Sequence, residues 1–375
     1  MSDFLPYGRQ HITEEDVQAV AAALRDPLIT QGPRVAEFER AFADAVGARH
    51  AVAFATGTAA LHAAAVAAGV GPGDAVLTTP ISFVASANCA LFAGGRPRFA
   101  DIEPATGNLD LARAESGGVK AIVPVSLSGL PVDLGPAQAL REEGVVVIED
   151  ACHALGGGRA GRPIGGDGMA DMYAFSLHPV KAITTGEGGV VTTGDDGYAA
   201  HMREFRTHGM RRGEGADPWH YDVVELGFNY RITDFACALG SSQLGRLAAF
   251  VDARNEVAER YRERLAGVDG LVLPAEPAPG DRHAYHLFVV RFADGEQVRR
   301  RAALHLRERG IGTQLHYIPI YRHTLYRNLG YDLELPHAED YYAQALSLPM
   351  FPSMGAADVE RVALALEEVL SGVAA

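Results

Sequence analysis

Lysine is rare in this chain, and its placement is the first pointer to chemistry. Only Lys120 and Lys181 occur among the 33 basic residues of the 375-residue sequence. The other basic residues are arginines, whose guanidinium suits surface charge and anion contacts but does not lose its proton to act as an amine nucleophile. Lys181 is the stronger candidate for such an amine, because it follows the strand-like residues 172–176 by five positions. The ordinary alternative is a solvated lysine on a loop.

A carboxylate and a set of phosphate donors accompany other predicted strands. Glu149 and Asp150 follow the apolar residues 145–148, which places an acid at the carboxyl end of a predicted strand. Residues 56–58, Thr-Gly-Thr, lie between a predicted strand and a predicted helix. Amides at a helix N-terminus suit a phosphate, and glycine permits a close approach. Alone, the first feature could be a surface acid or a helix cap, and the second a plain turn.

An amine, a carboxylate and phosphate donors together predict a site for pyridoxal 5′-phosphate (PLP). PLP requires an amine for a Schiff base, a carboxylate at its pyridinium nitrogen and donors for its phosphate. Lys181 would supply the amine, and Asp150 would keep the ring nitrogen protonated so that the ring accepts electrons. Phe83, which opens a predicted helix, would stack on the ring. Its alternative is a core aromatic.

The elements that must position these residues alternate between strand and helix. This order and spacing predict βαβ units and a mostly parallel sheet, and such sheets bind ligands at the carboxyl ends of their strands. Strands are predicted at residues 50–55, 75–78, 121–125, 145–148, 172–176 and 189–193, and helices at 33–46, 57–68, 83–92 and 231–247.

The pattern changes in the last third of the chain. From about residue 255 it predicts a helix, a strand at residues 287–292 and another helix. The proline-rich residues 273–280 would form a loop. We therefore expect a large PLP-binding domain over residues 1–250 and a smaller C-terminal domain over residues 251–375.

Composition excludes several classes of function. The net charge of −14, from 33 basic and 47 acidic residues, argues against a nucleic-acid partner, because phosphate contacts need a basic surface. No membrane partner is expected, since no apolar run reaches about 18 residues and the N-terminus lacks the order of a signal peptide. Three cysteines without a CxxC pair predict neither a disulfide framework nor a metal site and fit a reducing cytoplasm.

With these residues in place, the sequence resembles the DegT/DnrJ/EryC1/StrS family of sugar aminotransferases. The similarity covers essentially the whole chain, and its strength lies in the number of blocks in family order. It implies the fold-type-I PLP aminotransferase architecture, an α/β fold whose large domain has a mostly parallel sheet between helices and whose smaller C-terminal domain is α+β. Matching blocks lie at residues 6–9, 28–33, 56–61, 149–153, 176–181, 187–189, 227–231, 316–317 and 347–349.

The resemblance also implies roles for single residues. Lys181 matches the catalytic lysine, and its retention, where some family members have histidine, favours transamination. Asp150 matches the catalytic partner of the ring nitrogen, and Phe83 matches the stacking ring. Asn229 matches a residue that reaches the phosphate from the other subunit, which implies a homodimer with shared active sites. The other implied cofactor contacts are Gly57, Thr58 and Ser176 around the phosphate and His153 near the cofactor's oxygens.

The substrate class is implied in the same way. The family aminates a keto group on a nucleotide-linked sugar, usually with glutamate as amino donor. Blocks at residues 7–10, 80–88 and 316–319 are most similar to the branch that serves pseudaminic acid biosynthesis, which acts at C4 of a UDP-linked 4-keto-6-deoxy-N-acetylhexosamine. Contacts would then fall on Tyr7, Thr30, Gln31 and Tyr317 for the sugar and on Arg231 for the diphosphate.

Alternatives to this assignment stay open. Tyr317 could pack beside Pro319, and Arg231 could be a structural cation at a helix start. The same chemistry could act on a GDP- or dTDP-linked 4-keto sugar, or on a 3-keto sugar. The chain could also be a catalytically silent PLP-fold regulator, although the intact Lys181 and Asp150 argue against that.

Overall fold

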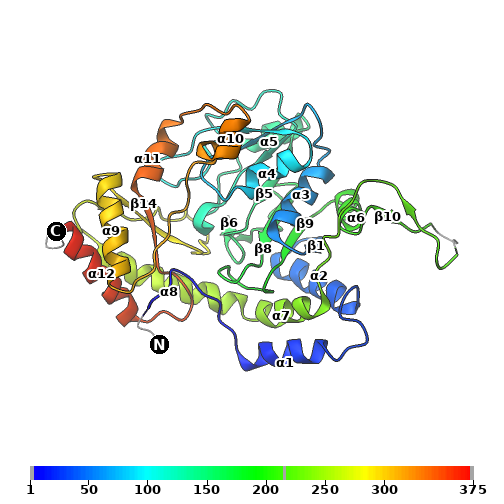
Figure 1. Cartoon of the computed structure of the whole chain (residues 1–375), viewed down its shortest axis with the longest axis horizontal. Helices are drawn as coiled ribbons and strands as arrows, with labels where there is room; N and C mark the ends of the chain where they lie inside the picture. The colour runs from blue at the N-terminus through cyan, green and yellow to red at the C-terminus, as the bar shows by residue number, and fades with distance from the viewer. Residues whose placement is uncertain (1–3, 214–216, 372–375) are drawn as a thin grey trace.

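The computed structural model describes residues 4–213 and 217–371, and Figure 1 shows how its elements are arranged. The helices are α1 (Glu14–Ala23), α2 (Pro33–Val46), α3 (Gly57–Ala67), α4 (Ala85–Phe92), α5 (Ala137–Glu142), α6 (Asp196–Phe205), α7 (Asp234–Leu244), α8 (Leu247–Leu265), α9 (Glu296–Glu308), α10 (Thr324–Asn328), α11 (Pro336–Gln344) and α12 (Ala356–Leu370), with short 3₁₀ turns at Leu127–Gly129 and Ile320–Arg322. The strands are β1 (His50–Phe54), β2 (Ala75–Thr78), β3 (Arg96–Phe99), β4 (Ala121–Val123), β5 (Val146–Asp150), β6 (Gly158–Arg159), β7 (Arg162–Pro163), β8 (Met172–Ser176), β9 (Gly189–Thr193), β10 (Met210–Arg211), β11 (Asp222–Val223), β12 (Leu271–Val272), β13 (Phe288–Phe292) and β14 (Ala345–Leu348).

A seven-stranded sheet forms the centre of the fold, in the order β1-β9-β8-β5-β4-β2-β3. The pairs from β3 through β2, β4 and β5 to β8 are parallel. β9 is antiparallel to both of its neighbours, β8 and β1, so it alone runs against the other strands of this sheet. The predicted α/β class with a mostly parallel sheet is confirmed.

Helices cover both faces of this sheet, because successive side chains of a strand point to opposite sides. On one face, Ala53, Ile122 and Val147 pack with Phe38 and Phe42 of α2. On the other face, the intervening strand residues pack with the alanine-rich α3. Burial on both sides is the reason these strands appear in the sequence as continuous apolar runs rather than as an alternating pattern.

A second sheet, of order β12-β13-β14, is antiparallel throughout. Together with α8, α9 and α12 it encloses a separate core, and these elements lie at the left of Figure 1. α8 links the two cores, since Val251 lies in the core of the large sheet and Val257 in that of the small one. Leu5, from the start of the chain, also packs in the second core. The division into residues 1–250 and 251–375 therefore falls inside a continuous helix, and it stays a prediction.

The predicted helix at residues 231–247 is wrong at both ends. α7 begins only at Asp234, because the Thr233 side chain accepts a hydrogen bond from the amide of Ala236 at 3.4 Å and so caps the first turn. α7 ends before Gly245, whose low helix propensity favours a break there.

Two other boundaries place the candidate site residues differently from the prediction. β5 continues through Asp150, which pairs with Ala174 of β8, so the acid belongs to the strand rather than following it. α4 begins at Ala85, so Phe83 lies in the loop before the helix. β3 was not predicted; it is an edge strand whose Arg-Pro-Arg sequence lacks the apolar run of its neighbours.

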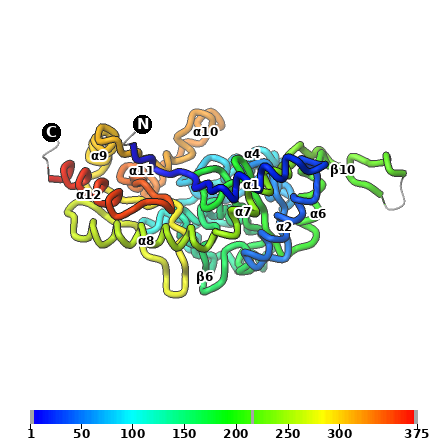
Figure 2. Tube along the Cα trace, turned by 90° about the horizontal axis from the view of Figure 1, so that it is seen from below, coloured from blue at the N-terminus to red at the C-terminus, as the bar shows by residue number. Residues whose placement is uncertain are grey.

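The β10–β11 hairpin projects away from the body of the molecule in both views (Figures 1 and 2). Large apolar residues on and near it are exposed, among them Trp219 at 76% and Leu226 at 86% of the full exposure of the residue. Among the described helices, none combines the length and the apolar character that crossing a bilayer requires.

Candidate active site

A cavity of about 670 Å³ lies at the carboxyl ends of β5 and β8, where a sheet of this kind binds its ligands. Its volume is in the usual range for small-molecule sites. Segments far apart in the sequence form its wall, from the N-terminal residues to residues 314–318. Of the residues predicted to form the site, those that line it are Tyr7, Gly57, Thr58, Phe83, Asp150, His153, Ser176, Lys181 and Tyr317.

Lys181 lies on the loop that follows β8, and its amide donates to the carbonyl oxygen of His178 at 2.9 Å. This turn brings the lysine side chain back to the cavity. Burial lowers the pKa of Lys181 from its ordinary value. A lowered pKa favours the neutral amine, which is the nucleophilic form.

Asp150 is a buried carboxylate, 4% exposed, with both oxygens held in place. The hydroxyl of Ser86 donates to Oδ2 at 2.6 Å, and the amide of Cys152 donates to Oδ1 at 3.1 Å. Each carboxylate oxygen has two lone pairs, so Asp150 can still accept a hydrogen bond from a group in the cavity. It is therefore a fixed acceptor for a protonated ring nitrogen.

The start of α3 and the end of β8 form a cradle for an anion. The hydroxyl of Thr56 caps the helix by accepting from the amide of Ala59 at 3.0 Å. The amides of Gly57 and Thr58 have no partner within the helix and lie at its positive end. A Cβ built on Gly57 would lie 2.9 Å from the Cβ of Ser176, so only glycine lets the helix start approach the strand end this closely.

The residues present fit PLP. Lys181 supplies an amine, Asp150 an acceptor for the ring nitrogen, and the α3 cradle the donors for a phosphate. Phe83 lines the same cavity and is 57% exposed, a surface that a planar ring would cover. The cavity thus has the hydrogen-bonding groups and the shape to hold PLP. The role of each single residue in holding it stays a prediction.

His153 and Tyr317 form a hydrogen-bonded pair in the cavity wall. The amide of Ser128 donates to Nδ1 of His153 at 3.2 Å, and Nε2 lies 3.2 Å from the Tyr317 hydroxyl. Burial and the nearby charge of Lys181 hold the pKa of His153 well below its ordinary value, so the ring is neutral with its proton on Nε2. His153 therefore donates to the Tyr317 oxygen, and the hydroxyl proton of Tyr317 is free to donate to a ligand.

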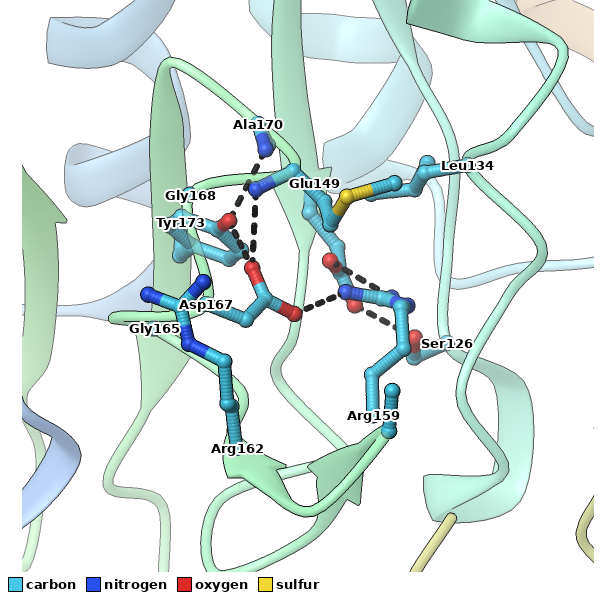
Figure 3. A network of polar contacts seen from close by, with 12 residues as sticks. Ser126, Leu134, Glu149, Arg159, Arg162, Gly165, Asp167, Gly168, Ala170 and Tyr173 are labelled. Atoms are coloured by element: carbon cyan, nitrogen blue, oxygen red, sulfur yellow. Dashed lines mark hydrogen bonds and ion pairs between the residues drawn. The ribbon is translucent and has the colours of Figure 1, made fainter. Parts of the chain in front are cut away.

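Glu149 points to the other side of β5, into a buried ionic network (Figure 3). Arg159 bridges Glu149, at 2.9 Å, and Asp167. Ser126 donates to Glu149 at 2.5 Å, and the hydroxyl of Tyr173 donates to Asp167. Because strand side chains alternate, this network anchors the strand from behind while Asp150 faces the cavity.

Four of the predicted site residues do not line the cavity of this chain. Thr30 forms a bridge to Thr233, which holds Thr30 and Gln31 beside the start of α7, both exposed. Asn229 is also exposed, and Arg231 is partly buried next to it. Their roles in binding stay predictions, and their surface position is what a contribution to another subunit's site requires.

Several residues of the site were not singled out from the sequence. Ser86 holds Asp150, and its signal was its place one helical turn after Phe83. His286 and His316 line the cavity, and the His286 ring centroid lies 4.4 Å from that of His153. No periodicity distinguishes such histidines, because they come from loops that only the fold brings together.

Comparisons with known proteins agree with this geometry. Residues 10–367 match the model of the DegT/DnrJ/EryC1/StrS aminotransferase family. The chain is 37% identical to the spore coat polysaccharide biosynthesis protein SpsC of Bacillus subtilis, over 98% of each chain. Among solved structures it is similar to Helicobacter pylori PseC, an aminotransferase involved in the biosynthesis of pseudaminic acid, with 31% identity, a TM-score of 0.92 and coverage of 99% and 100%. It is also similar to the PLP form of Spr1654 from Streptococcus pneumoniae, with 27% identity, a TM-score of 0.92 and coverage of 99% of each chain.

The fold and the family match define a PLP-dependent aminotransferase of fold type I. The chain belongs to the DegT/DnrJ/EryC1/StrS aminotransferase family. The resemblance seen in the sequence blocks is thus confirmed at the level of the family, its sugar aminotransferase activity and its cofactor.

Proposed function

We propose that this enzyme transfers the amino group of glutamate to C4 of a UDP-linked 4-keto-6-deoxy-N-acetylhexosamine, in pseudaminic acid biosynthesis. The observation that carries the reaction type is that Lys181 and Asp150 face one cavity at the sheet edge. The similarity to PseC supports the choice of sugar, together with the blocks around Tyr7 and Tyr317. The cytoplasm is the proposed compartment, because Cys89, Cys152 and Cys237 are all free thiols.

Each residue of the site has a defined task in this proposal. PLP, when bound, supplies an aldehyde that condenses with amines and a ring that accepts the electron pair of a carbon that loses its proton. Lys181 holds the cofactor through Nζ, and its free amine then moves the proton at the reacting carbon. Asp150 keeps the ring nitrogen protonated. Phe83 would stack on the ring, and His153 would pack near the cofactor's oxygens.

The sugar contacts follow from the hydrogen-bonding groups of the wall. A neutral sugar ring offers hydroxyl and amide groups and an apolar face, so it is recognised by hydrogen bonds and packing. Tyr317 presents a free hydroxyl proton, because His153 already donates to its oxygen. Burial raises the pKa of Tyr317, so the phenol keeps that proton at neutral pH. Tyr7 lines the same cavity.

The charge of the cavity supports a homodimer with shared active sites. Among the described residues that line the cavity, Lys181 is the only lysine and there is no arginine, whereas Asp150 and Glu187 are acidic. A nucleotide diphosphate and glutamate are both anions and need cations. Arg231 lies outside the cavity on a partly exposed surface, close to exposed apolar side chains such as Phe228. A second copy of the chain would bring such a cation to the site and cover that surface.

The reaction type can be tested directly because the chain has only two lysines, Lys120 and Lys181. Borohydride treatment of the holoenzyme should fix the cofactor covalently to Lys181. Lys181→Arg should abolish both the fixation and turnover, because a guanidinium cannot form the imine. Lys120→Arg is the matched control and should keep both. Fixation at Lys120 would contradict the assignment.

The substrate is tested with a panel of UDP-, GDP- and dTDP-linked 4-keto sugars, with glutamate as donor. The position of the new amine is then determined by NMR. We expect the UDP-linked N-acetyl sugar to have the highest kcat/KM and to be aminated at C4. A preference for a GDP- or dTDP-linked sugar, or amination at C3, would overturn the substrate assignment and leave the PLP chemistry intact.

A further inference from the structure

Arg254 is a buried arginine on the apolar stripe of α8. Its exposure is 1%, and the neighbours on the same stripe are Phe250, Val257 and Tyr261. No carboxylate in the described part of the chain forms an ion pair with it, and its Nε is buried without a hydrogen-bond partner. A buried charge without a counter-ion is costly, so a site that retains one calls for a reason beyond packing.

The guanidinium of Arg254 connects segments that meet at the active site. Nη1 donates to the carbonyl oxygens of Tyr285 at 3.2 Å, His286 at 3.3 Å and Met350 at 3.0 Å. Nη2 donates to the carbonyl oxygen of Val180 at 3.5 Å. Val180 directly precedes Lys181, and the His286 ring lines the cavity. The planar fork of arginine makes several such contacts at once, which an ammonium group cannot match.

One of these contacts is at a strained point of the backbone. Tyr285 has a φ of +44°, a left-handed conformation that a residue with a Cβ adopts at a cost. Such conformations persist only where the surroundings impose them, and they cluster at functional sites. The hydrogen bond from Arg254 to the Tyr285 carbonyl is one of the contacts that impose it.

Arg254 also places an unneutralised charge near the catalytic amine. Carbonyl oxygens have only partial negative charge, so four of them solvate the guanidinium without cancelling it. Lys181 and Arg254 both line a small cavity of about 10 Å³, and none of the residues around this cavity is acidic. Two other basic side chains line it, the imidazole of His11 and the guanidinium of Arg9, which lies over the ring of Phe351.

We propose that Arg254 is a positioning residue, which fixes Lys181 and His286 relative to each other and holds a positive charge behind the lysine to favour its neutral amine. The proposal rests on the proposed function in one respect, that Lys181 is the reactive amine. It goes beyond that function by giving α8, the helix that links the two cores, a part in preparing this amine.

Most of the other groups that face Lys181 are uncharged, so they do not replace Arg254 as a charge that favours the neutral amine. Burial lowers the pKa of His153 and His286 well below the ordinary value and that of His316 to about 3, so all three rings are neutral at pH 7. Burial raises the pKa of the Cys152 thiol, which stays protonated. Asp150 favours the ammonium form of Lys181, and Arg254 opposes it. Glu187 is the other acidic residue that lines the cavity with Lys181.

The presence of only two lysines allows a direct test in the PLP-free, full-length chain. Reductive methylation with ¹³C-formaldehyde labels both lysine side chains and the α-amino group of the chain. Lys120→Arg and Lys181→Arg each remove one signal and so assign the two lysine signals. In Arg254→Gln the titration midpoint of Lys181 should rise by about one pH unit, because a like charge is removed, while the signal of Lys120 is unchanged. Arg254→Lys adds one labelled amine, which is recognised as the signal absent from the parent. It keeps the charge and should leave the Lys181 midpoint within about 0.3 pH units, but it should lower kcat about tenfold, because the planar guanidinium is lost.

Arg262→Gln is the matched control. Arg262 lies on the same helix and also donates to carbonyl oxygens, those of Pro274 and Ala275, but it does not line the small cavity. Its replacement should leave the Lys181 midpoint unchanged. An unchanged midpoint in folded Arg254→Gln, or an equal shift in Arg262→Gln, would overturn the charge role. If Arg254→Gln does not fold, parental kcat in Arg254→Lys would overturn the positioning of Lys181 and His286 by the guanidinium. The titration needs no cofactor or substrate. Its failure would therefore contradict the role of Arg254 alone, whereas failure of the borohydride test would contradict the proposed function.

Discussion

Gly57 is the residue at which a single methyl group should separate cofactor binding from folding. A Cβ on Gly57 would lie 2.9 Å from the Cβ of Ser176, well inside the 3.4 Å at which ordinary contact begins. The atom it meets is the Cβ of Ser176, which is fixed to the backbone at the end of β8. The clash is therefore relieved only by moving the start of α3 or the end of β8. Either movement displaces the amides and the hydroxyl predicted to hold the phosphate.

The expected size of the effect follows from the hydrogen bonds at risk. One charge-assisted hydrogen bond contributes about 1.5–3 kcal/mol, so its loss weakens PLP binding about 10- to 150-fold. The net cost to stability should be smaller, because the helix propensity of alanine partly offsets the displacement, which costs about 1–3 kcal/mol at a crowded buried contact. Gly57 is the first residue of α3, and alanine is favoured over glycine in a helix by up to about 1 kcal/mol.

The assay is a titration of the PLP-free protein with PLP, followed by absorbance, alongside chemical denaturation of the same samples. Gly194→Ala is the matched control, because a Cβ there meets no atom within 4 Å and its backbone is not left-handed. We expect Gly57→Ala to lose affinity and Gly194→Ala to keep it, with both variants folded in the absence of denaturant. Parental affinity in Gly57→Ala, or an equal loss in the control, would refute the cradle.

Three further predictions concern the reaction itself. Asp150→Asn should lower kcat by at least about 100-fold with little change in unfolding, because an amide cannot hold the ring nitrogen protonated; near-parental turnover would count against the role. Tyr317→Phe should raise the KM for the sugar nucleotide about 3- to 10-fold, the cost of one hydrogen bond, with PLP affinity unchanged; a loss of PLP affinity instead would place Tyr317 on the cofactor. Mixing inactive Lys181→Ala with an inactive double variant, Asn229→Ala plus Arg231→Trp, should restore part of the activity, since a mixed dimer with shared sites has one intact site. No recovery after proven subunit exchange would refute shared sites.

The sequence by itself determined the chemistry of the site and the class of the fold. Lys181 stood out because a chain that uses arginine almost everywhere retains an amine there, and Asp150 because an apolar run ends beside it. These signals are local: strand, turn and helix patterns extend over a few residues, so they place a side chain at a sheet edge without knowledge of its neighbours. The mostly parallel sheet and the cofactor followed from that placement and are confirmed.

The tertiary structure decided which side chains act on these residues. Ser86 reaches Asp150 across 64 positions of the chain, and Arg254 reaches the carbonyl of Val180 across 74. Such pairs depend on how helices pack on strands, which no local pattern encodes. The sequence offered one clue to Arg254, a charged residue on the apolar stripe of α8, but not its acceptors. Likewise, only the fold shows that Asn229 lies outside the cavity of its own chain, because the position of the cavity is set by the packing of distant segments.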